Sequence, residues 1–200
     1  MMKYIMPSIK HRGVNVVDDL RVKMAVEQWN KFKKQKSNGQ NKDKKQIIAL
    51  VNCFLKQIGI GVNAKFGNEW PVANGEKRTQ RRISYSDIKE KSGIDHKEDI
   101  VWIKFNKSEC VSVVGVGCDI YFTQKAKDET SAGKINSFLK QLDQDENHEN
   151  YEWDEGTVLV FPLINLKELE GFDRSDIESG IGNYLIDNDV PILDYYSHNY

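Results

Sequence analysis

The sequence predicts an α+β fold: a small, mostly antiparallel sheet with a central β-hairpin, packed by helices and preceded by an N-terminal helical region. Residues 99–105 (DIVWIKF) and 110–116 (CVSVVGV) are two β-rich runs separated by a short turn, which is typical of a hairpin. Residues 18–36 and 44–58 carry apolar residues at helical spacing. We therefore expect helices that cover one face of the sheet.

Two helices are expected before the sheet. Asp18 or Asp19 is the expected N-cap of the first helix, because a short acidic side chain can accept from the free N–H groups of the first turn; this helix runs to about Lys36. The second helix, over about residues 44–58, is broadly apolar and therefore buried. Gly59 ends it.

Within the hairpin, successive side chains alternate between the two faces of the sheet. Alternation puts Val101, Ile103 and Phe105 on one face. It puts Trp102 and Lys104 on the other, and we expect Trp102 to be buried or to line a pocket.

Further elements are expected after the hairpin, the last of them a short strand over residues 190–193. Residues 118–123 extend its second strand past a glycine bulge at Gly115 or Gly117. An amphipathic helix over residues 130–142 and a buried strand over residues 157–164 follow. Ser175 or Asp176 opens the last helix.

Length and composition limit the class of protein. The chain has 200 residues, and 10% aromatic content is too high for a disordered chain. We expect one compact unit, made of a basic helical and loop region over residues 1–90 and an α+β core over residues 91–200. No apolar stretch is long enough for a membrane span and no signal peptide is visible. Three cysteines without metal-like spacing indicate reduced thiols, so we expect a cytoplasmic protein; a homodimer is among the open oligomeric states.

Charge is distributed unevenly along the chain. Residues 1–100 carry 21 Lys and Arg against 11 Asp and Glu, a net of +10, whereas residues 101–200 carry 8 against 19, a net of −11. The basic half favours a polyanionic partner, DNA or RNA. The alternative is that the two halves neutralise one another in the fold.

Candidate phosphate contacts come from two basic segments. Arginine forks pair with phosphate, and lysines add positive charge beside the backbone. The candidates are Lys33, Lys34, Lys77, Arg78, Arg81 and Arg82. The alternative is a solvated basic surface.

The order of elements in the C-terminal half resembles the GIY-YIG nuclease family over about residues 99–195. The hairpin carries Ile100-Val101-Trp102 and Val113-Val114-Gly115 at the places of the family's two motifs. A helix with Lys134, a strand and a last helix with Glu178 follow. The resemblance implies a metal-dependent DNA endonuclease of restriction or phage-defence type, with Mg²⁺ held by Glu178 and Lys134 facing the scissile phosphate.

The chain also departs from that family's pattern. Trp102 stands where the family has a tyrosine, and an indole cannot accept a proton. Either Tyr121 replaces that function, or the domain is inactive, or the likeness is accidental. Asp119 and Asp176 are the nearest further candidates for metal ligands.

A second resemblance leads to a function without catalysis. Residues 96–101 followed by residues 113–117 are similar to the strand pair of PUA-like and EVE reader domains, which bind modified bases in an aromatic pocket. The resemblance implies a reader of modified or flipped bases, with walls from Trp102, Tyr121, Tyr151 and Trp153. A third alternative is a protein-binding inhibitor or immunity factor whose acidic face, around residues 143–155, mimics nucleic acid.

Overall fold

The computed structural model describes residues 14–60, 68–71, 80–83, 100–106, 108–117, 120–123, 157–163 and 171–194. The helices are α1 (Val14–Ser37), α2 (Lys44–Gln57) and α6 (Arg174–Asp187). The strands are β1 (Asn68–Pro71), β2 (Gln80–Ile83), β3 (Ile100–Phe105), β4 (Val111–Gly117), β5 (Ile120–Thr123) and β6 (Thr157–Pro162). None of the described helices is both long and apolar enough to cross a membrane.

The predicted α+β class and the hairpin are confirmed. An antiparallel sheet has the strand order β1-β6-β3-β4, and β2 pairs with β5 in a separate two-stranded sheet. The expected extension of β4 is wrong, because β5 leaves the hairpin to pair with β2. The expected glycine bulge is also wrong: the register shifts between Lys104 and Phe105, and it is regular where Gly115 faces Trp102.

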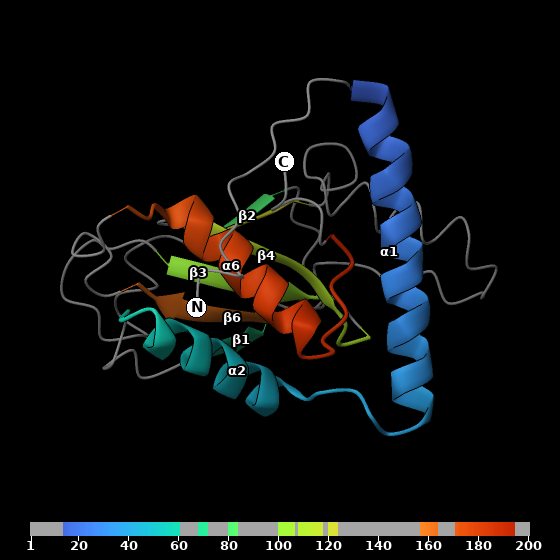
Figure 1. Cartoon of the computed structure of the whole chain (residues 1–200), viewed down its shortest axis with the longest axis horizontal. Helices are drawn as coiled ribbons and strands as arrows, with labels where there is room; N and C mark the ends of the chain where they lie inside the picture. Colours follow the sequence, from blue (N-terminus) through green and yellow to red (C-terminus); the bar gives the residue numbers. More distant parts are fainter. Residues whose placement is uncertain are drawn as a thin grey trace.

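The main core lies between the sheet and the helices α2 and α6. Figure 1 shows these two helices over the same face of the sheet. The apolar side of β3, made of Val101, Ile103 and Phe105, packs in one buried cluster with α2 and with Ile177 and Ile181 of α6. Since α2 precedes residue 91, both predicted regions of the chain contribute to this core.

Helix ends differ in how well the sequence located them. α2 begins with a capping box in which Asp43 accepts from the backbone of Gln46, and Gly59 follows its C-cap at φ +82°. α6 is capped by Asp173, two residues earlier than the nearest expected cap. α1 begins at Val14, so the expected cap at Asp18 or Asp19 is wrong and both residues lie inside the helix.

α1 packs through a second, smaller cluster. Ala25, Trp29 and Phe32 lie one helical turn apart and contact Cys110 and Leu193. The rings of Trp29 and Phe32 stack with centroids 5.4 Å apart. Figure 1 shows α1 standing at one end of the sheet, across the direction of the strands.

The expected helix over residues 130–142 and the acidic stretch at residues 143–155 lie outside the described residues.

Candidate nucleic-acid interface

Lysines concentrate where α1 ends and α2 begins. Residues 31–45 contain seven lysines and a single acid, Asp43. We call these lysines the basic junction: Lys31, Lys33, Lys34, Lys36, Lys42, Lys44 and Lys45. Lys33, Lys34 and Lys45 are exposed. The junction therefore presents positive charge to solvent.

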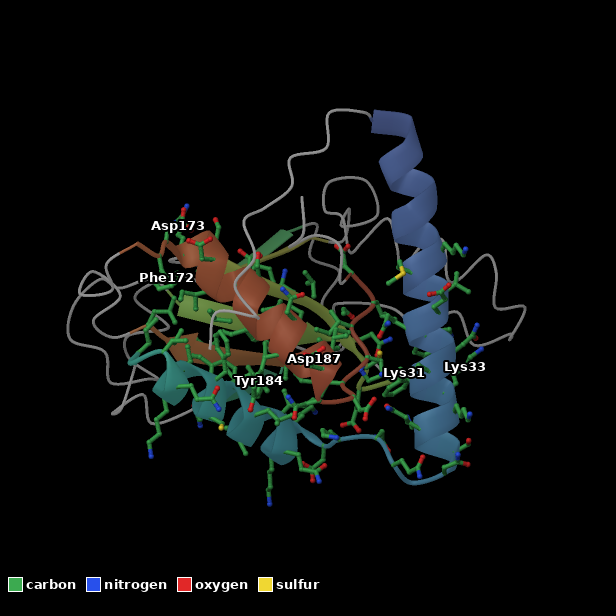
Figure 2. All side chains as sticks on the ribbon, in the orientation of Figure 1. Lys31, Lys33, Phe172, Asp173, Tyr184 and Asp187 are labelled. Atoms are coloured by element: carbon green, nitrogen blue, oxygen red, sulfur yellow. The ribbon has the colours of Figure 1, made fainter. Side chains whose placement is uncertain are left out.

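The amphipathic pattern of α1 positions the exposed lysines. Its apolar side, around Trp29 and Phe32, faces the rest of the protein, so Lys34 projects from the opposite side of the helix. The Nζ of Lys33 lies 5.8 Å from the centroid of the Trp29 ring. Figure 2 shows Lys33 on the outer side of α1 and Lys31 on the side nearer α6.

One carboxylate beyond the end of α6 contacts the basic junction. An oxygen of Asp189 lies 3.0 Å from the Nζ of Lys31, and the side chain of Gln35 donates to the Asp189 carbonyl at 3.0 Å. The hydrogen bond and the charge of Lys31 hold the pKa of Asp189 below its usual value, and Lys42 contributes in the same direction. Asp189 therefore pairs with Lys31, and Lys42 adds positive charge at longer range.

A second carboxylate contacts the junction from the β3–β4 turn. An oxygen of Glu109 lies 3.1 Å from the Nζ of Lys44, at the start of α2. The Nζ of Lys36, at the end of α1, donates to the carbonyl of Ser108 at 3.0 Å. The hairpin turn is thus joined to both helices by lysines.

Glu109 and Asp189 share an unusual backbone conformation. Their φ angles are +71° and +61°, and they are the non-glycine residues with positive φ in the described part of the chain. A residue with a side chain is less stable in this left-handed conformation, and an exposed ion pair offsets little of that loss of free energy. The side chains of Glu109 and Asp189 are 65% and 73% exposed, whereas those of Lys44 and Lys31 are 19% and 36% exposed.

The second face of the sheet carries Trp102 and Lys104, and the predicted alternation is confirmed. The half-buried indole of Trp102 lies across Gly115 of β4 so closely that a Cβ there would collide with it. The Nζ of Lys104 lies 4.6 Å from the centroid of that ring. This placement is a cation–π contact, and it occupies an aromatic surface that a base would need for stacking.

Lys104 is a buried amine. It is 7% exposed and lies in register between Val113 of β4 and Val158 of β6, both of which are buried. Burial disfavours the charged form and lowers the pKa of Lys104 from 10.5 to about 7. The lysine therefore changes charge near neutral pH.

The predicted metal ligands on α6 have distinct roles. Asp176 completes the capping box: its carboxylate accepts from the backbone N–H of Asp173 at 2.9 Å. Glu178 is half-buried two residues further along, and it makes an interaction within the protein. Within the described residues, no three His, Cys, Asp or Glu side chains are grouped so that they could hold a metal.

The structure does not bring Glu178 and Trp102 together. α6 packs on the face of β3 that carries Val101 and Ile103, and Trp102 points from the opposite face. The sheet therefore separates the two residues that the nuclease resemblance placed in one site.

Other predicted site residues are described in part or not at all. Lys77, Arg78, Asp119 and Lys134 lie outside the described residues. For Arg81, Arg82 and Tyr121 the backbone is described, and Arg82 pairs with Tyr121 across β2 and β5. The register thus brings a predicted phosphate contact next to a predicted catalytic residue.

Sequence reasoning missed three residues of these sites. Lys104 had a signal, because alternation puts it on the same face of the strand as Trp102, which was expected to be buried or to line a pocket. Glu109 and Asp189 had none, because both lie far along the chain from the lysines that they contact.

Comparisons of the chain with protein-family models, with curated proteins and with solved structures give no significant match. Both family resemblances therefore stay predictions.

Proposed function

We propose that this protein binds nucleic acid, and that the basic junction contacts the phosphate backbone. The observation that supports the proposal is the concentration of seven lysines against one acid in residues 31–45 of a chain whose net charge is −1. Lysine contacts to phosphate release counterions, and they carry no sequence information. Binding through this surface is therefore salt-dependent and largely independent of sequence.

Three exposed lysines form the proposed contact: Lys33, Lys34 and Lys45. Changing all three to glutamine should flatten the slope of log affinity against log salt by about two to three units for duplex DNA. The affinity should fall alike for unrelated sequences. Fluorescence anisotropy with a labelled duplex, over a series of salt concentrations, measures both quantities.

Lys56 provides the matched control. It is exposed in the last turn of α2, about 18 Å along the helix from Lys44. Lys56→Gln should leave the slope unchanged. If the junction and control substitutions change the slope equally per charge removed, the junction lysines are solvated surface charges and do not form a specific phosphate contact.

A metal-dependent endonuclease activity is a second, more specific proposal. The described order of hairpin, strand β6 and helix α6 matches the order that the GIY-YIG resemblance implies. Glu178 would hold Mg²⁺ together with ligands outside the described residues. Glu178→Ala should then abolish magnesium-dependent nicking of plasmid DNA and leave binding intact, whereas absence of nicking by the unmodified chain would leave a reader or another binding protein as the better proposal.

A further inference from the structure

We propose that the polar face of α1, formed by Lys23, Glu27, Asn30 and Lys34, enters the major groove of duplex DNA. Lys23 and Lys34 each contact one phosphate backbone, and Asn30 reads an adenine between them. The inference rests on the proposed function and deepens it, because lysine contacts to phosphate carry no sequence information. It names the kind of nucleic acid and a residue that recognises a base.

The polar face lies opposite the side through which α1 packs. That packing side is made of Ala25, Trp29 and Phe32, which are all buried. The four residues of the polar face follow one another at spacings of four, three and four positions, so they form one stripe along the helix, and all four are exposed. Figure 1 shows α1 at one end of the sheet. The polar face is therefore presented to solvent.

The length of the polar face fits the major groove. This groove of B-DNA is about 12 Å wide and admits an α-helix. Lys23 and Lys34 are eleven residues apart, which is about 16 Å along the helix axis. When α1 lies across the groove, each lysine therefore reaches the backbone on one side. Glu27 and Asn30 then lie over the base edges between the two backbones.

The charge and the hydrogen-bonding groups of α1 match DNA. Residues 14–37 carry six Lys and Arg against three Asp and Glu, a net of +3. An asparagine amide donates to N7 of adenine and accepts from its N6 amino group, and a glutamate accepts from the amino group of cytosine. Both central residues of the polar face therefore suit base edges. Because the major groove of an RNA duplex is too deep and narrow for side chains to read, the proposal is restricted to DNA.

The test compares two short duplexes that differ at one atom of each adenine. An alternating dA·dT duplex presents adenine N7 in the major groove, and the same duplex built with 7-deazaadenine has carbon at that position. The unmodified chain should bind the first duplex about tenfold more tightly, because the bond from Asn30 is lost with N7. Asn30→Ala should bind both duplexes equally and keep the salt slope, since the amide is uncharged. Alanine also favours the helix, so this variant should fold.

Two further variants connect the effect to α1. Asn38→Ala is the matched control, because Asn38 is exposed in the turn that follows α1, and this variant should keep the tenfold preference. Lys23→Gln should flatten the salt slope by about one unit, although Lys23 lies outside the basic junction. An unchanged slope for Lys23→Gln would contradict the placement of α1 across the groove.

The outcomes separate this inference from the proposed function. If the unmodified chain shows salt-dependent binding but does not distinguish the two duplexes, or if Asn30→Ala keeps the preference, then reading by α1 is wrong and the proposed function stands. If the unmodified chain shows no salt-dependent binding to either duplex, both fail. A preference that Asn30→Ala abolishes and Asn38→Ala retains establishes that α1 reads adenine in the major groove.

Discussion

Lys104 shows how a single residue couples burial to charge. Its amine lies on a sheet face between two buried valines, and its one described aromatic neighbour is Trp102. Placing a cation there carries a desolvation penalty, which lowers its pKa from 10.5 to about 7. A cation–π contact offsets part of that penalty.

The lowered pKa of Lys104 predicts that the free energy of unfolding increases with pH. Between pH 7 and 10.5 the unfolded chain holds the proton on Lys104 and the folded chain does not, so its destabilising effect is complete below pH 7 and disappears towards pH 10.5. The shift corresponds to roughly 5 kcal/mol. Lys104→Met should therefore raise the free energy of unfolding by a few kcal/mol at pH 6 and by little at pH 10, as measured by urea denaturation.

The exposed Lys56 is the reference for that measurement. Lys56→Met should change stability by the same small amount at both pH values, because its charge is solvated in the folded and unfolded chains. If the effect of Lys104→Met does not change with pH, the amine is not held in its neutral form near pH 7.

At the scale of elements, local signals in the sequence located most helices and strands. The two β-rich runs around a turn predicted the hairpin, and the run of apolar residues after Asp43 predicted α2. Caps were harder. Asp173, Ser175 and Asp176 can all accept from backbone N–H groups, and only the reciprocal bond between Asp173 and Asp176 decides which residue begins α6.

The sequence did not predict which strands far apart in the chain pair with one another. Nothing local indicates that β6 inserts between β1 and β3, or that β5 leaves the hairpin for β2. For the candidate site, too, the sequence did not predict contacts between residues far apart in the chain. Lys33 and Lys34 were recognised from local charge, but the partners of Lys31 and Lys44 come from a turn and a helix end more than sixty residues away. Such contacts follow from the tertiary fold.

At the scale of the whole molecule, the described residues form two cores of unequal size. The main core joins α2, α6 and the sheet, whereas α1 is held by a five-residue cluster with Cys110 and Leu193. Next to that cluster, the buried Nδ2 of Asn106 and Oε1 of Gln28 have no hydrogen-bond partner among the described residues. The exposed ion pair of Asp189 with Lys31 adds little to the attachment of α1. We therefore expect α1 to separate from the rest of the protein more readily than the main core unfolds.

Cys110 reports this separation directly. Its thiol is buried beneath α1, and burial raises its pKa, so it should react with a thiol reagent only when α1 moves away. The exposed Cys53 should react rapidly under all conditions and serves as the internal reference, in a Cys118→Ser background. Because salt screens the ion pair of Lys31 with Asp189, which joins α1 to the end of α6, added sodium chloride should speed the reaction of Cys110 slightly and leave that of Cys53 unchanged. Asp189→Asn should have the same effect at low salt. If neither added salt nor Asp189→Asn changes the reaction rate of Cys110, and this rate equals the rate of global unfolding, then α1 and the main core form one cooperative unit.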